Sequence, residues 1–496
     1  MIMRRYIAVV WLLGGVFAWV GCSDGPLHRA RRAAEATGNG EMLRVADHYA
    51  GEPERLAAAA FLLENLRGHY TYTFDLLDAS GRVAEGFSLY RPEITGKNYR
   101  QVLDSAGLSV RYRTEADAET MTADYLIRNI DRAFAARERY PWAAHYSDSL
   151  FLHYVLPYRI DVEELTDWRA FFRDRYEPMV DTLAGPKDIR TVARLIIRDV
   201  KSRFGFHAEA LMLKPAFTPQ EAFACGRGEC NSTADIYVLA LRAMGIAATK
   251  DVIPVWGTSD GGHVEAVYFD EEGNPVMLDT GEWLAAGPPK IFRQEFEPQP
   301  QSAERFGNPY YRDVTSEYVA VSTPTVAFDS APEAGERAAL AVFGNERWRP
   351  AVPAEAPPTE GKALFKEIGR GILYLPVYVS DRSVRQAGRP FRLDPRGNLH
   401  YYGADTGRPV TIDITSLIRP RDVDTLDAGG LYVAYWTPEG WQRSEATVCQ
   451  SAGGGSPVYT VSGIPDGGIY CLFDKRTGRT YYRRIFRNDR GTARRF

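Results

Sequence analysis

The sequence predicts an α+β protein that is mainly helical towards its N-terminus and rich in β-strands towards its C-terminus. Apolar residues recur at helical spacing as far as about residue 205, whereas β-branched and aromatic segments broken by Gly and Asn dominate from residue 248 onwards. Aromatic residues make up 12% of the chain, which agrees with extensive strands. At 496 residues, the chain exceeds one ordinary domain of about 150 residues, which predicts several folding units.

The first residues have the composition of an export signal. Arg4 and Arg5 precede an apolar run over 7–20, which is too short for a membrane-spanning helix and predicts a signal peptide over 1–21. The following Trp19-Val20-Gly21-Cys22 resembles the lipobox of bacterial lipoproteins, which implies a lipid on Cys22 and a place in the cell envelope, facing outside the cytoplasm. A plain signal peptide and an uncleaved anchor are the alternatives.

Residues 22–180 are expected to form a mainly helical N-terminal region. Helices are predicted over 51–66, 122–140 and 163–176, and a further one over 188–204 at the start of the next region. Pro53 falls in the first turn of its helix, where a missing N–H costs no hydrogen bond. A short strand is expected over 70–77.

Residues 181–304 are expected to form a second unit around the stretch CGRGECNSTADIYVLALRAMG. A helix is predicted over 231–244, ending at Gly245, and strands are predicted over 248–256, 263–270 and 275–280. Cys230 would then lie at the helix N-terminus, where unpaired N–H groups and the helix dipole favour a thiolate. Gly226 and Gly228 allow a tight loop before it.

The predicted strands contain a general base for the Cys230 thiol and a residue that could orient this base. His263 opens one strand and Asp279 closes the next, and a Gly273-Asn274 turn would make these strands antiparallel neighbours. The sequence thus predicts a Cys–His–Asp catalytic arrangement of Cys230, His263 and Asp279. By itself, a cysteine with a histidine further along the chain is more often a coincidence.

The combined motifs resemble the transglutaminase-like superfamily over residues 185–290. They are Gly228-Glu-Cys230 with Ala234, then Arg242-Ala-Met-Gly245-Ile246, then His263 and Asp279 on separate strands. The resemblance implies a papain-like core in which Cys230 is the nucleophile, His263 the general base and acid, and Asp279 the orienting residue. It also implies attack on an amide through a thioester, without cofactor or metal.

The sequence departs from that family two residues after the histidine, where Glu265 occupies the usual position of a Trp. Alternation along a strand places Glu265 on the face of His263. Glu265 either raises the pKa of His263 or is a solvated side chain, which is the more common case.

Other residues near this core allow several roles. Cys225 is either a small buried residue or the disulfide partner of Cys230. A zinc site is a further alternative, and its ligands would be Cys225, Cys230, His207 and His263. Trp256 and Trp283 belong to the core or line a cleft, with the core favoured. Arg227 either supports a thiolate or is a surface charge.

The C-terminal third contains a weak internal repeat, in which DVTS at Asp313 recurs as DITS at Asp413 and the segment around Trp348 recurs around Trp441. The repeat predicts two tandem β-sandwich-like modules over 305–397 and 398–496. Cys449 and Cys471 fall in the second module, where a structural disulfide between them is an open alternative.

These observations predict a membrane-anchored cysteine enzyme that acts on a peptide or protein amide, with hydrolysis favoured over cross-linking. The formal net charge of −4 argues against nucleic acid as a partner. The rival prediction is an inactive scaffold of the same fold whose β-modules bind a glycan or a protein at the cell surface.

Overall fold

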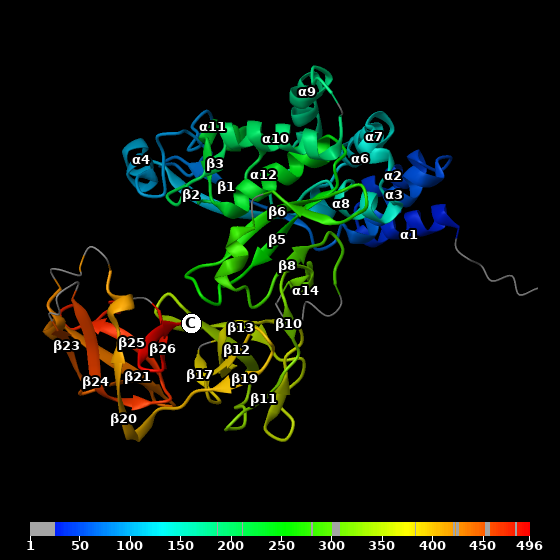
Figure 1. The fold of residues 1–496 in the computed structure, drawn as a ribbon. Helices are drawn as coiled ribbons and strands as arrows, with labels where there is room; N and C mark the ends of the chain where they lie inside the picture. Colours follow the sequence, from blue (N-terminus) through cyan, green and yellow to red (C-terminus); the bar gives the residue numbers. More distant parts are fainter. Residues whose placement is uncertain are drawn as a thin grey trace, which may run out of the picture.

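The computed structural model describes residues 25–185, 187–210, 212–278, 281–299, 308–381, 383–419, 422, 426–451, 457–481 and 484–496. The protein is α+β with a sheet-rich C-terminal region, as the sequence predicts (Figure 1). Within this described part, no helix is both long and apolar enough to cross a membrane. The predicted signal peptide with Cys22, and Asp279, lie outside the described residues.

The helices lie mainly in the first half of the chain. They are α1 (Pro26–Thr37), α2 (Glu41–His48), α3 (Pro53–Asn65), α4 (Tyr99–Ala106), α5 (Asp117–Thr120), α6 (Ala123–Arg139), α7 (Pro141–Ala144), α8 (Asp148–Tyr154), α9 (Trp168–Asp181), α10 (Ile189–Arg203), α11 (Pro219–Cys225), α12 (Cys230–Ala243) and α14 (Thr315–Tyr318), with short 3₁₀ turns η1 (Glu282–Ala286), η2 (Thr415–Leu417) and η4 (Ala428–Gly430). Between them, β1 (Tyr70–Leu77) pairs antiparallel with β2 (Ser109–Ala116).

Local side chains define where the long helices begin. Thr122, Asp167 and Asp188 each accept a hydrogen bond from a backbone N–H in the first turn of α6, α9 and α10, respectively. Such a cap contributes about 1 kcal/mol by satisfying a donor that the helix leaves unpaired. The helices predicted over 51–66, 122–140, 163–176 and 188–204 are confirmed with shifted ends.

The N-terminal helices and α12 share one hydrophobic core. Buried residues of α3, α6, α9 and α10 pack with those of α12 in a single continuous cluster. The Nε1–H of Trp142 donates to the carbonyl of Met244 at 2.9 Å, and Arg169 donates to the carbonyl of Arg242 at 3.1 Å. The helical region therefore supports the end of α12 directly.

A central sheet lies against α12. Its order is β7-β6-β5-β8-β9, and all of its pairs are antiparallel. The strands are β5 (Ala248–Ile253), β6 (His263–Phe269), β7 (Pro275–Met277), β8 (Phe292–Gln294) and β9 (Tyr311–Asp313), and a short parallel pair, β3 (Gly205–Phe206) and β4 (Arg227–Gly228), precedes it. Because β9 belongs to this sheet, the core extends beyond the predicted boundary at residue 304.

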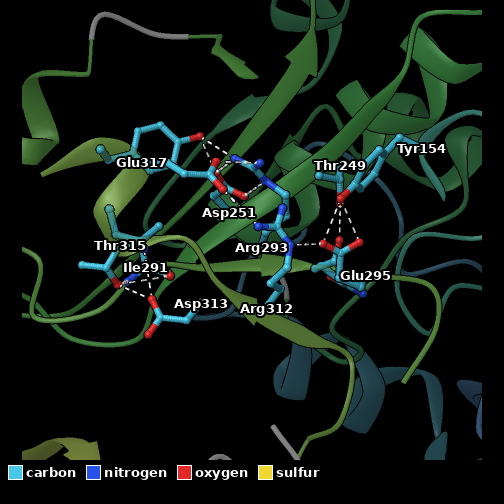
Figure 2. A network of polar contacts seen from close by, with 12 residues as sticks. Tyr154, Thr249, Asp251, Ile291, Arg293, Glu295, Arg312, Asp313, Thr315 and Glu317 are labelled. Atoms are coloured by element: carbon cyan, nitrogen blue, oxygen red, sulfur yellow. Dashed lines mark hydrogen bonds and ion pairs between the residues drawn. The ribbon is translucent and has the colours of Figure 1, made fainter. Parts of the chain in front are cut away.

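A buried network of charges ties β5 to β8 and α14 (Figure 2). Arg293 binds Asp251 through two hydrogen bonds of 2.9 and 2.8 Å and Glu317 through a third of 2.9 Å. The Tyr318 hydroxyl also donates to Asp251. Because Asp251 is paired with Glu265 across β5 and β6, this network fixes the strand next to the predicted site.

The C-terminal region contains two larger sheets, drawn from yellow-green to red in Figure 1. The first has the order β13-β12-β16-β18-β19, with β17 also on β16, and the pairs β10–β15 and β11–β14 lie beside it. These strands are β10 (Val321–Ser322), β11 (Thr325–Ala327), β12 (Arg337–Gly344), β13 (Arg347–Pro353), β14 (Lys362–Leu364), β15 (Ile368–Gly369), β16 (Leu373–Val379), β17 (Val384–Gln386), β18 (Phe391–Leu393) and β19 (Leu399–Tyr401).

The second sheet has the order β22-β21-β25-β26-β27-β20-β24-β23. Its strands are β20 (Asp405–Asp413), β21 (Leu431–Thr437), β22 (Gly440–Arg443), β23 (Thr447–Ser451), β24 (Val458–Asp466), β25 (Ile469–Asp474), β26 (Phe486–Asp489) and β27 (Thr492–Arg495). Contacts of β21 with β23 and β24 show that the sheet curls around its own hydrophobic core. Because β19 pairs with β18, the first sheet runs past the predicted boundary at residue 397.

The repeated motifs occupy equivalent local structures. Asp313 accepts a hydrogen bond from the N–H of Thr315 at 3.0 Å, and Asp413 accepts one from Thr415 at 2.8 Å. Trp348 and Trp441 both pack around Trp436, with ring centroids 5.7 and 5.1 Å away, where the two sheets meet. Cys449 lies on β23 and Cys471 on β25, and the structure forms no disulfide between them.

Candidate functional site

Cys230 is the first residue of α12, as the sequence predicts, and it is partly exposed. Gly226 ends α11 with φ +75°, a conformation that favours glycine. A Cβ on Gly228 would lie 2.4 Å from the ring of Phe204, so this position needs glycine for a different reason, the close packing of the loop. The loop thus delivers Cys230 to the positive end of the helix dipole.

His263 begins β6 and interacts with Cys230. Burial alone would lower the pKa of His263, but side-chain hydrogen bonds to Cys230 and Glu265 and the negative charges of both outweigh it and raise this pKa to about 9. An imidazole with such a pKa is protonated at neutral pH, and a cationic neighbour favours the thiolate form of a cysteine. The two predicted residues are therefore brought together as a thiol–imidazole pair.

Glu265 lies on the same face of β6 as His263, as predicted. Its Oε2 atom is 3.1 Å from Nε2 of His263, and Glu265 is only 8% exposed. The expectation of a solvated side chain is therefore wrong. Burial and the charge of Glu265 together raise the pKa of Tyr237 on α12 to about 12.

Two tryptophans flank the imidazole of His263. The ring of Trp256 stacks on it with centroids 5.9 Å apart and an interplanar angle of 20°, and the ring of Trp283 lies 5.5 Å away at 47°. Both tryptophans also pack with Ile253 and Ile291 in a small hydrophobic cluster. Trp256 is therefore a buried core residue, as the sequence favoured, whereas Trp283 is only partly buried. Both restrict the orientation of the imidazole.

A buried cation anchors the residue after the nucleophile. The Nζ atom of Lys250 donates to Asn231 at 2.8 Å, to Asp161 at 2.6 Å and to Asp235 at 2.7 Å. Burial would lower the pKa of Lys250, but the two carboxylates outweigh it and raise that pKa. This cluster was missed in the sequence, although a lysine inside the otherwise buried strand segment ATKDVI is a signal that could have found it.

The orienting residue of the predicted triad stays a prediction, because Asp279 lies outside the described residues. The hairpin that leads to it is confirmed. Gly273 has φ +83°, the N–H of Asp270 donates to the carbonyl of Asn274 at 3.0 Å, and Val267 is paired with Met277. The strand that precedes Asp279 therefore runs antiparallel to the strand that carries His263.

The remaining alternatives near the core are now decided for Cys225 and Arg227. Cys225 is a buried free thiol and forms no bridge to Cys230. Arg227 donates to the carbonyl of Pro92 and so has a structural partner. In the part of the chain that the structure describes, His207 and His263 belong to no group of three or more His, Cys, Asp and Glu that could hold a metal.

A cavity of about 970 Å³ lies between the central sheet and the first C-terminal sheet. Val252, Pro254, Phe292 and Tyr311 line it from the core, and residues 336–339 and 350–358 line it from the other side. Neither Cys230 nor His263 is among its lining residues. It adjoins the site at the end of β5, where Val252 and Pro254 flank Ile253, the cross-strand partner of His263.

Comparison with known proteins adds no functional assignment. No family model matches the chain, and no curated protein gives a significant match. The candidate site therefore stands on its own geometry, which joins Cys230 and His263 to two residues outside the predicted triad, Glu265 and Trp256.

Proposed function

We propose that the protein is a transglutaminase-like cysteine enzyme that acts on peptide or protein amides. The observation that carries the proposal is the position of His263, which interacts with Cys230 at the N-terminus of α12 and has its Nε2 atom 3.1 Å from Oε2 of Glu265. A partly exposed thiol at a helix N-terminus beside a protonated imidazole is the chemistry that an amide-cleaving cysteine enzyme requires. The resemblance of residues 185–290 to this superfamily agrees with it.

The reaction follows from the pair. The Cys230 thiolate attacks the carbonyl carbon of the amide, and backbone N–H groups at the start of α12 supply donors for the resulting oxyanion. His263 gives its proton to the departing amine as the C–N bond breaks, which leaves a thioester. Water then attacks the thioester carbon while His263 takes a proton from it. The C–S bond breaks, which releases the carboxylic acid product and regenerates the Cys230 thiolate.

The predicted lipid on Cys22 would hold this site at a membrane surface in the cell envelope. Substrates would then be peptides or proteins outside the cytoplasm. No cofactor or metal is required by the proposed chemistry.

Mass spectrometry of peptides before and after incubation with the full chain tests this function. We expect new acidic products from amide hydrolysis in the wild type and none with Cys230→Ala. The thioester can be hydrolysed by water or transferred to an amine. Adding a primary amine in excess distinguishes the two reactions, because transfer gives an amide of the added amine instead of the acid. Unchanged peptides across a proteome-derived library would contradict the proposal.

The second candidate function is binding of a glycan or protein by an inactive core. The cavity of about 970 Å³ between the central sheet and the first C-terminal sheet favours it, because a closed junction between folding units would leave no such space. Replacing Ala354, a half-buried residue in its wall, by Trp would obstruct part of this cavity. Under this function, Ala354→Trp weakens ligand capture while Cys230→Ala leaves capture unchanged.

A further inference from the structure

The loop that leads into β6 is part of the environment of His263. It runs over 256–262, and the N–H of Trp256 donates to the carbonyl of Gly261 at 3.1 Å, which closes the loop on itself. One end carries the indole that stacks on His263, and the other end is joined to His263 through Gly262. A Cβ on Gly262 would lie 2.4 Å from the carbonyl oxygen of Ile253, so only glycine fits where the loop joins β6.

The same loop also holds the second tryptophan of the site. The N–H groups of Gly257 and Thr258 donate to the carbonyls of Gly287 and Ala286 at 2.8 and 3.0 Å. These carbonyls lie at the end of η1, the turn that contains Trp283. A displacement of the loop would therefore move both aromatic neighbours of the imidazole.

Residues from both C-terminal sheets bind this loop. The backbone N–H of Asn345 donates to Oδ1 of Asp260 at 2.8 Å, and Nη1 of Arg349 donates to the carbonyl of Gly261 at 3.1 Å. Asn345 and Arg349 come from the β12–β13 hairpin of the first sheet. Arg484, between β25 and β26 of the second sheet, forms an ion pair with the same Asp260 oxygen at 3.1 Å.

The hairpin tip is a two-residue turn that contacts both the loop and the second sheet. Asn345 and Glu346 have φ values of +51° and +63°, as a tight turn of this length between antiparallel strands requires. Oε1 of Glu346 accepts a hydrogen bond from Thr480 at 2.6 Å. The turn therefore holds the N–H of Asn345 towards Asp260 while its other residue contacts the second sheet.

We infer that Asp260 is a positioning residue through which both C-terminal sheets set the orientation of His263 relative to Cys230. The inference rests on the proposed function, and it assigns to the sheets a role in the reaction besides any binding. Separating the hairpin tip or Arg484 from Asp260 would release the loop, its stacked Trp256 and the imidazole together. The C-terminal sheets are then a required part of the active site.

Two readouts on the full chain test this inference. The first is the alkylation rate of Cys230 by iodoacetamide, followed on its own peptide by mass spectrometry so that exposed Cys449 does not contribute. The second is the titration of the His263 imidazole by NMR, which does not depend on any activity. Each is measured in the wild type, Asp260→Ala and Arg484→Ala, with His263→Ala as the reference for complete loss and for assigning the imidazole signal.

Asp489→Ala is the matched control, because Asp489 also pairs with an arginine of the second sheet, at 3.0 Å, and is 31% exposed against 25% for Asp260. We expect Asp260→Ala to slow alkylation about tenfold to a hundredfold, since a displacement near 1 Å has effects of this size on oriented groups. We expect Arg484→Ala to have a smaller effect and Asp489→Ala none. The pKa of His263 should fall in Asp260→Ala and Arg484→Ala but not in Asp489→Ala.

The outcomes separate this inference from the proposed function. If Cys230 of the wild type reacts as an ordinary thiol, the proposed function fails, and the His263 titration alone decides the role of Asp260. An unchanged titration in both Asp260→Ala and Arg484→Ala would overturn the inference even if Cys230 is activated. Arg484→Ala keeps the Asn345 contact, so it supplies the answer if Asp260→Ala does not fold.

Discussion

The Nε2 atom of His263 lies 3.1 Å from Oε2 of Glu265, and both side chains project from the same face of β6. Under the proposed transglutaminase-like function, this pair is the point where the chain departs from the pattern it resembles, in which position 265 would be a Trp. With Glu265 in this position, His263 still interacts with Cys230. The Glu265 carboxylate gives the imidazole a buried negative neighbour while Trp256 and Trp283 supply the aromatic contacts.

Glu265→Gln is expected to lower the pKa of His263 from about 9 towards its ordinary value of 6.5. Glutamine keeps the size and a hydrogen-bond acceptor but removes the charge that stabilises the imidazolium. NMR titration of the imidazole measures the change. A pKa that is equal in the variant and the wild type would show that Glu265 has no electrostatic role.

The same pair predicts how stability depends on pH. A histidine whose pKa is raised on folding contributes stability that is fully present below its unfolded pKa near 6.5 and is lost as pH rises through about 9. The difference in unfolding free energy between the wild type and Glu265→Gln should therefore be largest at pH 6 and shrink by pH 10. Urea denaturation at both pH values checks it, and a difference that grows with pH would contradict it.

Lys250→Met is expected to destabilise the fold by about 3–5 kcal/mol, because removing one partner of a buried ion pair leaves the other charge without compensation. Lys250 is 1% exposed and binds Asp161, Asp235 and Asn231. Urea denaturation measures the loss.

Lys187→Met is the matched control for this change, because Lys187 is a surface residue whose Nζ lies 3.9 Å from Asp181. An exposed pair of this kind contributes about 0–1 kcal/mol. Equal losses in the two variants would mean that the cluster beside Cys230 is no more important than a surface pair.

Gly262→Ala is expected to slow alkylation of Cys230 and to cost about 1–3 kcal/mol of stability, as overpacking of a filled site does. The added Cβ would meet the carbonyl oxygens of Ile253 and Pro254 at 2.4 and 2.6 Å, and only a shift at the start of β6 can relieve these contacts. Gly51→Ala serves as control, since no atom lies within 4 Å of its added Cβ. Identical alkylation rates in both variants would contradict the expected shift of His263.

Much of this site could be predicted from local sequence signals. A glycine loop before a helix placed Cys230, and a Gly-Asn turn between β-branched segments placed the strand of His263 beside an antiparallel neighbour. The face shared by His263 and Glu265 followed from strand alternation. These features depend on neighbours along the chain, which is why periodicity and turn residues reveal them.

Contacts between distant segments could not be predicted in the same way. Lys250 binds Asp161, which comes from the N-terminal region, and Asp260 binds Asn345 and Arg484 from the two C-terminal sheets. No local pattern encodes these pairs, because each depends on how separate units pack. Strand pairing across the predicted boundaries at 304 and 397 is of the same kind, since β9 pairs with β8 and β19 pairs with β18.

The most direct test of the central claim is the pH dependence of Cys230 alkylation by iodoacetamide, compared between the wild type and His263→Ala. We expect Cys230 of the wild type to be alkylated rapidly at neutral pH, because a neighbouring imidazolium favours the thiolate form of a cysteine. The alkylation rate at neutral pH should fall in His263→Ala. An inert Cys230, or a profile that is the same in both proteins, would show that the thiolate–imidazolium pair does not form.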